Sequence, residues 1–177
     1  MSVVINGSAG VTTNSGAVYD GIQSATAQAS TSGTSINFTG IPSWVKRITV
    51  MFSGVSTNGS SLVQIQLGDS GGFETTGYLS GAASLVNGSS VNGANSTTGI
   101  LVLGSNAATI VFYGVASLSL IGSNRWVMGF SGGRTDAAAA LSAGGSKTLS
   151  DTLTQIRITT VNGTDTFDAG SINILYE

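Results

Sequence analysis

The chain has 177 residues, a formal net charge of −2 and only 8% charged residues, against 41% hydrophobic residues. It contains neither cysteine nor histidine, which excludes disulfide and thiol chemistry and closes off most zinc, iron and nucleophilic sites. The few basic residues are scattered and no apolar run approaches the roughly 20 residues of a membrane span, so we expect neither nucleic-acid binding nor membrane insertion.

Residues 1–32 form a segment rich in small side chains, which we expect to be an extended N-terminal arm before a single domain of residues 33–177. Ser2–Ile5 is a possible short strand, and Tyr19 and Ile22 are isolated apolar residues that could anchor the arm. Two roles remain open for the segment. It is either a flexible leader or an arm that docks on a neighbouring subunit.

The stretch from Thr34 to Leu67 predicts three short strands with turn residues between them. Pro42 fixes its own φ and lacks an amide donor, so it separates the first strand from the second. Because three strands follow one another so closely, we expect them to form an antiparallel sheet. The predicted inward-facing residues are Ile36, Phe38, Ile48, Val50, Phe52, Val63, Ile65 and Leu67.

Residues 68–99 are dense in Gly, Ser and Asn and are predicted to be long loops, with Asn87-Gly88 and Asn92-Gly93 as turns with positive φ. The alanine-rich stretch 134–144 predicts either a short helical turn or a loop. Loops on a rigid scaffold often carry recognition, so residues 68–99 and 131–147 are the candidate recognition segments.

The second half of the chain predicts further strands with alternating apolar residues. Trp126, Met128 and Phe130 share one strand face, which we interpret as core rather than as a platform for stacking sugars. About eight to ten strands with frequent turns predict an all-β fold, an antiparallel, jelly-roll-like β-sandwich. The predicted segments are 100–103, 109–113, 115–121, 125–130, 151–161 and 171–177.

Asp165 and Asp168 are the carboxylates that most resemble a candidate site, because they lie three residues apart in a predicted hairpin loop. A glycosidase pair or a calcium site is conceivable there, but the loop lacks the dense acidic spacing of calcium loops. We interpret both as partners of turn amides. No catalytic, cofactor-binding or metal-binding residue is therefore predicted, and the chain is not expected to be an enzyme.

The blocks IPSWVKRITVMFSGVSTNG and ITTVNGTDTFDAGSINILYE resemble a domain of tailed-bacteriophage and prophage virion proteins, often labelled tail fibre or tail protein. The resemblance implies a structural virion protein, assembled in the bacterial cytoplasm, that forms a homotrimer. Residues 1–32 would attach it to other virion proteins, and the sandwich would face a host-surface glycan or protein. The absence of charge from Thr75 to Asn124 independently favours a subunit covered by copies of itself.

Two alternatives stay open. One is a capsid decoration or head-fibre protein that stabilises the head, which differs from the tail protein only in its place on the particle. The other is a free carbohydrate-binding module or hydrolase, which predicts a monomer that binds sugar.

Overall fold

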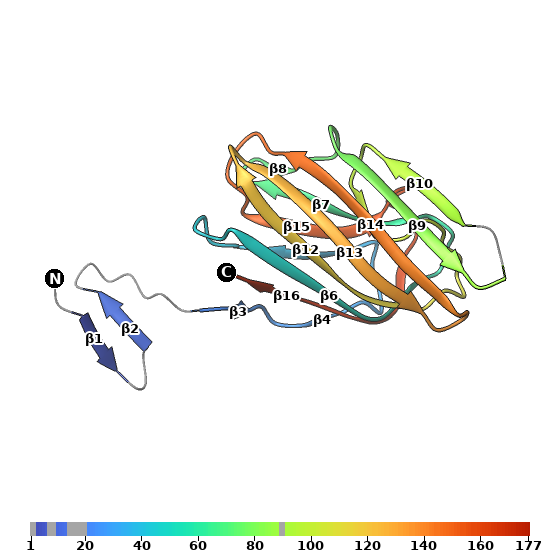
Figure 1. The fold of residues 1–177 in the computed structure, drawn as a ribbon, viewed down its shortest axis with the longest axis horizontal. Helices are drawn as coiled ribbons and strands as arrows, with labels where there is room; N and C mark the ends of the chain where they lie inside the picture. Colours follow the sequence, from blue (N-terminus) through green and yellow to red (C-terminus); the bar gives the residue numbers. More distant parts are fainter. Residues whose placement is uncertain (1–2, 7–9, 14–20, 89–90) are drawn as a thin grey trace.

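The computed structural model describes residues 3–6, 10–13, 21–88 and 91–177 of the chain. In these ranges it has no helix and consists of antiparallel strands, which confirms the predicted all-β, sandwich-like fold. Two sheets lie face to face, with the long strands of the larger sheet over the smaller one (Figure 1). Tyr19 lies outside the described residues.

The larger sheet has nine strands, and its middle is a continuous antiparallel meander in which β12, β13 and β14 follow one another. β4 (Gln28–Ala29) pairs with β16 beside β3, so residues before the predicted domain run along one edge of this sheet. From edge to edge the order is β10 (Asn92–Ser96), β9 (Leu79–Val86), β14 (Ala139–Thr148), β13 (Arg125–Arg134), β12 (Phe112–Gly122), β6 (Arg47–Thr57), β16 (Phe167–Tyr176) and β3 (Gln23–Ser24).

The smaller sheet has five strands, with β15 at its centre between β7 and β5. In the N-terminal segment, β1 (Val3–Asn6) and β2 (Gly10–Thr13) form a separate two-stranded hairpin. The strands of the smaller sheet are β11 (Ile100–Leu101), β7 (Val63–Asp69), β15 (Gln155–Thr160), β5 (Ser35–Thr39) and β8 (Gly72–Phe73), which pairs with β7.

The prediction that the three strands of residues 34–67 form one sheet is wrong. β5 and β7 flank β15 in the five-stranded sheet, whereas β6 lies in the nine-stranded sheet between β12 and β16. The connections 40–46 and 58–62 therefore cross from one layer to the other. Periodicity identifies which face of each strand is apolar, and all eight predicted inward-facing residues are buried. It does not identify the layer to which a strand belongs.

The core fills the space between the sheets with apolar side chains from both layers. Trp126, Met128 and Phe130 are buried within it, which confirms that this stripe is core. The ring of Phe52 lies 5.6 Å from that of Phe112 and 5.8 Å from that of Phe130, measured between centroids. Burial of each such side chain contributes roughly 1.5–3 kcal/mol, so this cluster stabilises β6, β12 and β13 as neighbours on the core face of the larger sheet.

The two segments predicted as recognition loops are largely strands. Residues 68–99 contain β8, β9 and β10, and the pair Asn92-Gly93 begins β10 instead of forming a turn. Gly88 does adopt a positive φ of 74°, as predicted. The alanine-rich stretch runs into β14, which pairs with β13 on one side and β9 on the other. A ladder on both edges outweighs the weak helical preference of so short a segment.

Residues 21–30 pack along β16. The buried Ser30 donates its hydroxyl to the carbonyl of Ala169 at 2.8 Å, and its amide donates to Gly170 at 2.9 Å. Gln28 reaches across to the other sheet, because its side-chain amide donates to the carbonyl of Asn37 on β5. Among the described residues, no helix is long and apolar enough to cross a membrane.

Candidate functional site

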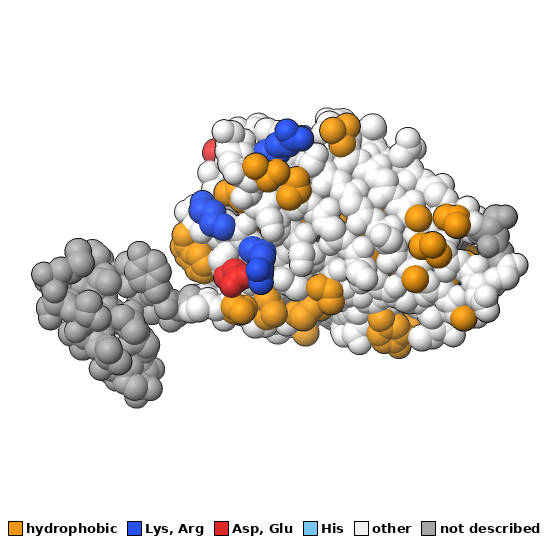
Figure 2. Space-filling model, in the orientation of Figure 1, with side chains coloured by type: hydrophobic (Ala, Val, Ile, Leu, Met, Phe, Trp, Pro, Cys, Tyr) orange, Lys and Arg blue, Asp and Glu red, His pale blue; other side chains and the backbone are white. Residues whose placement is uncertain are grey.

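The outer face of the nine-stranded sheet is almost free of charge. Over β9, β14, β13 and β12, the only described charged side chain that points outward is Arg125, at the start of β13. Farther along, Arg47 of β6 pairs with Glu177 at 2.7 Å. In Figure 2 the charged side chains in view lie toward the left-hand end of this face, and the rest is uncharged.

Large apolar side chains are exposed on the same face. Val115 and Tyr113 are each 45% exposed, Leu85 is 46% exposed and Ile121 is 66% exposed. Single exposed apolar residues are ordinary on a protein surface, but several on one uncharged sheet face are typical of an interaction surface.

A row of glycines crosses the centre of this face. Gly129 pairs with Ser117 on one side and with Gly144 on the other, and Gly144 pairs with Gly81. A Cβ atom built on Gly81 or Gly129 would meet no atom within 4 Å, and neither residue has a positive φ. The isolated fold therefore does not require glycine at either position. Strand glycines without such a need often mark the close approach of another backbone.

The outer face of the five-stranded sheet is polar and carries a groove. Gln66 lies opposite Arg157, and Gln64 lies opposite Thr159, in the ladder between β7 and β15. These four side chains line a cavity of about 340 Å³. Gln64 and Gln66 are only 1% and 4% exposed, although they point away from the core, because residues 96–98 and Arg157 cover them.

Of the described residues that line this groove, Arg157 alone is charged. Its Nε and Nη2 atoms both donate to Oε1 of Gln66, at 2.8 and 2.5 Å. Its guanidinium carbon lies 4.6 Å from the centre of the Phe73 ring. Gln66 is held in turn, because its side-chain amide donates to the carbonyl of Thr98 at 2.8 Å. The guanidinium is thus fixed between an aromatic ring and a buried amide oxygen.

Gln64 fixes the wall of the groove. Its Oε1 accepts hydrogen bonds from the hydroxyls of Thr98 at 3.1 Å and Ser96 at 3.4 Å. The backbone of Gly99 approaches so closely that a Cβ there would lie 2.6 Å from Oε1 of Gln64. Glycine at position 99 therefore allows the segment after β10 to lie directly on the sheet.

A cluster of charged and hydroxyl side chains closes one end of the sandwich near the groove. The buried Lys147 forms an ion pair with Glu74 and donates to the carbonyl of Thr76 at 2.9 Å. Glu74 also accepts hydrogen bonds from the amide and hydroxyl of Ser150, at 2.7 and 2.9 Å. The single hydroxyl hydrogen of Ser150 is shared between Glu74 and Asp69, whose Oδ2 atom lies 2.7 Å from the hydroxyl oxygen, and this ties the end of β7 to the segment after β14.

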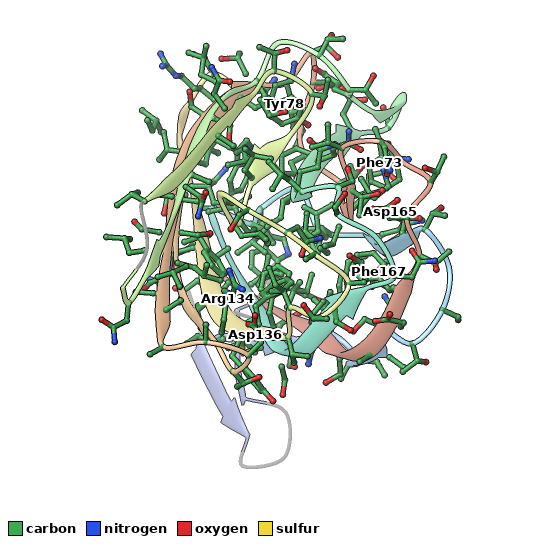
Figure 3. All side chains as sticks on the ribbon, turned by 90° about the vertical axis from the view of Figure 1, so that its right-hand side faces the viewer. Phe73, Tyr78, Arg134, Asp136, Asp165 and Phe167 are labelled. Atoms are coloured by element: carbon green, nitrogen blue, oxygen red, sulfur yellow. The ribbon has the colours of Figure 1, made fainter. Side chains whose placement is uncertain are left out.

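These contacts set the charge states of the cluster. Hydrogen bonds from Ser150 and from the amide of Gly71 hold the pKa of Asp69 below its usual value. Burial raises the pKa of Glu74, but the hydrogen bonds from Lys147 and Ser150 outweigh that effect and lower it overall. Burial raises the pKa of Tyr78 well above its usual value, so its hydroxyl stays protonated. Figure 3 places Tyr78 near the top, between the two layers.

Asp165 holds a turn, as predicted, whereas the prediction for Asp168 is wrong, because Asp168 lies in β16 and bonds a side chain of β6 instead of a turn amide. Oδ1 of Asp165 accepts from the side-chain amide of Asn162 at 2.7 Å, and Oδ2 accepts from the backbone amide of Ser61 at 2.9 Å. Asp168 accepts a hydrogen bond from the hydroxyl of Ser56. Within the described ranges, no three acidic side chains gather as metal ligands would. Figure 3 shows Asp165 and Phe73 on the side of the five-stranded sheet.

The sequence places only Thr75 and Thr98 of this groove in a predicted recognition segment, and it predicts none of the four strand residues of the groove as a site. Gln64, Gln66, Arg157 and Thr159 all occupy the polar positions of alternating strands, where a surface residue is the ordinary expectation. The feature that distinguishes them is the pairing of β7 with β15, about 90 residues apart in the chain. That pairing cannot be read from strand periodicity, which is local.

No protein-family model matches the chain, and none of the curated proteins matches it. Among solved structures, the chain aligns with a protein of unknown function from Shewanella oneidensis MR-1. The alignment covers 99% of this chain and 73% of the other, with 10% sequence identity and a TM-score of 0.28. A similarity this low supports no inference about fold or function.

Proposed function

We propose that this chain is a structural bacteriophage virion protein, a tail-fibre or tail-associated subunit that assembles as a homotrimer. Residues 1–32 attach it to other virion proteins, and the sandwich recognises the host surface. The resemblance of its two sequence blocks to virion domains supports the biological context. The uncharged outer face of the nine-stranded sheet is the structural observation that supports assembly.

The glycine row is the strongest part of that observation. Glycine within a strand costs roughly 0.5–1 kcal/mol relative to alanine, because it loses more conformational freedom on folding. Gly81 and Gly129 make the fold less stable without relieving any contact or any strained φ in the subunit. A neighbouring subunit that packs closely on this face would give both glycines a purpose, and it would also cover Val115 and Tyr113.

Assembly is tested by placing a charge on this face. Val115→Lys should dissociate the oligomer, because a buried interface does not accommodate an unpaired ammonium group. Thr39→Lys is the matched control, since Thr39 is exposed on β5 in the opposite sheet. Sedimentation equilibrium should give a trimer for the unmodified chain and for Thr39→Lys, and a monomer for Val115→Lys. A monomeric unmodified chain at micromolar concentration would contradict the assembly proposal.

The place in the particle needs a separate experiment. Antibody labelling of purified particles, imaged by electron microscopy, should mark the tail. Labelling spread over the capsid lattice would favour the capsid decoration protein over the tail protein. No labelling of the particles would contradict the proposal that the chain is a virion protein.

A carbohydrate-binding module is the second candidate, and the groove on the five-stranded sheet is the observation that favours it. The groove is concave, lined by amides and hydroxyls, and held in shape by side chains that are themselves hydrogen-bonded. A monomer that binds sugar would favour this candidate over the virion subunit.

A further inference from the structure

The charge of Arg157 is not balanced by a carboxylate. In the described part of the chain, the other basic side chains with printed partners form ion pairs within 4 Å, namely Arg47 with Glu177, Arg134 with Asp136 and Lys147 with Glu74. Arg157 has the neutral amide oxygen of Gln66 in the corresponding place. An amide oxygen orients the guanidinium without cancelling its charge.

The remaining guanidinium donors are preorganised. Phe73 holds the carbon of the guanidinium at 4.6 Å from its ring centre, and Gln66 engages only Nε and one N–H of Nη2. An arginine fixed in this way loses little side-chain entropy when a ligand binds, which is the condition for a strong contact with an oxyanion.

The rest of the groove carries neutral hydrogen-bonding groups. Asn162 adds the second N–H of its side-chain amide, whose oxygen and first N–H are already hydrogen-bonded within the loop. Thr34, Ser35, Thr75 and Thr98 line the groove with hydroxyls. Such groups both donate and accept hydrogen bonds, which matches the hydroxyls of a sugar.

A second hollow adjoins the groove. This hollow of about 440 Å³ shares Thr98 and Val161 with the groove and extends toward Tyr78 and Asn95. Each hollow falls within the range of about 300–1,000 Å³ that is usual for small-molecule sites, so the two together suit a ligand of more than one ring.

We propose that this groove binds an acidic saccharide, with a sugar carboxylate on Arg157 and the sugar hydroxyls on the threonine and amide side chains around it. This inference rests on the recognition part of the proposed function and is independent of assembly, because the groove and the uncharged face belong to opposite sheets. Sedimentation measures assembly and ligand titration measures saccharide binding, so failure of the assembly proposal is distinguishable from failure of the binding proposal.

The test is a calorimetric titration of the full chain with trigalacturonic acid, with the neutral trisaccharide maltotriose as comparison. The acidic trisaccharide should bind and the neutral one should bind at least about tenfold more weakly, the ratio expected for loss of a charge-assisted hydrogen bond. Arg157→Gln should weaken binding of the acid by at least about tenfold. Arg125→Gln, on an exposed arginine of the other sheet, should leave it unchanged.

Gln66→Glu places a carboxylate against Arg157 and removes the N–H that Gln66 donates to the carbonyl of Thr98. The variant gains an ion pair with Arg157 and loses that hydrogen bond, and it should lose binding of trigalacturonic acid, because the guanidinium charge is then neutralised. Its melting temperature separates this result from misfolding.

Three results would overturn the proposal. The first is no binding of trigalacturonic acid at millimolar concentration, and the second is unchanged binding in Arg157→Gln or Gln66→Glu. The third is an affinity for sodium acetate, measured by competition, that equals the affinity for trigalacturonic acid per carboxylate. The last result would show an anion contact without sugar recognition.

Discussion

Gly170 illustrates a residue whose conformation the fold requires. It has a φ of 92° and lies at an irregularity in the ladder between β16 and β6, where a Cβ would overlap the carbonyl oxygen of Gly54. Gly54 itself has a φ of 66°. The two glycines together let the strands approach at the irregularity. Gly81 is the opposite case, because nothing in the subunit constrains it.

Gly170→Ala should therefore destabilise the chain by roughly 2 kcal/mol or more, through both the strained φ and the backbone overlap. Gly81→Ala should leave the free energy of unfolding unchanged or raise it slightly, because alanine restricts the unfolded chain. Urea denaturation of the two variants, under conditions where the chain is monomeric, measures both values. Equal effects at the two positions would contradict the conclusion that the fold requires glycine at position 170 and not at position 81.

The segment 74–78 shows how one side chain fixes an element. The hydroxyl of Tyr78 accepts a hydrogen bond from the backbone amide of Leu67 at 2.7 Å and donates to the carbonyl of Glu74 at 2.9 Å. Both groups lie at the end of the sandwich where β7 and β8 give way to β9. Tyr78 is 1% exposed, so water cannot replace its hydroxyl.

Tyr78→Phe should cost about 1–3 kcal/mol, because a buried amide of β7 loses its partner. Tyr113→Phe is the control, since Tyr113 is 45% exposed and loses only a solvated hydroxyl. Its cost should stay within about 0.5 kcal/mol. Thermal or urea denaturation compares the two, and hydrogen exchange at Leu67 should accelerate in Tyr78→Phe alone.

Sequence patterns predict the faces of individual elements better than their partners. Ile65 and Leu67 are correctly predicted to face the core, because alternation is a local property of β7. The placement of β15 between β5 and β7 depends on contacts between segments about 90 residues or more apart. Arg157 meets Gln66 only through that placement, and so the groove could not be predicted.

The strand β14 was missed for a different reason. Its small residues resemble those of turns and short helices, whereas in the structure they make the flat outer surface of the sheet. Gly144 and Ser146 have intrinsic preferences too weak to oppose ladders on both edges. Charge-poor sheets of this kind are therefore easily mistaken for loops.

The whole molecule should lose stability in acid. Four carboxyl groups have a lowered pKa in the folded state. Hydrogen bonds from Ser150, Arg134 and Asn162 lower the pKa values of Asp69, Asp136 and Asp165, in that order. For Glu74, burial raises the pKa, but hydrogen bonds from Lys147 and Ser150 outweigh burial and lower it. A lowered pKa contributes stability above the unfolded pKa and loses it as the pH falls through the folded pKa. The free energy of unfolding should therefore be level near neutral pH and decrease below about pH 4.

Urea denaturation as a function of pH measures this decrease. Asp69→Asn should make the free energy of unfolding less dependent on pH, because the amide cannot titrate. The same variant should lower stability at pH 7 through weaker hydrogen bonds to Ser150 and Gly71. A stability that rises on acidification would contradict the assigned charge states.

The two outer faces of the sandwich point in opposite directions. If copies of the chain close a ring with one face, the other face of every copy is left on the outside. Under the proposed recognition role, each added copy then contributes another contact to the same host surface. Linked contacts gain from effective concentration, so a millimolar interaction per copy is enough for firm and still reversible adhesion.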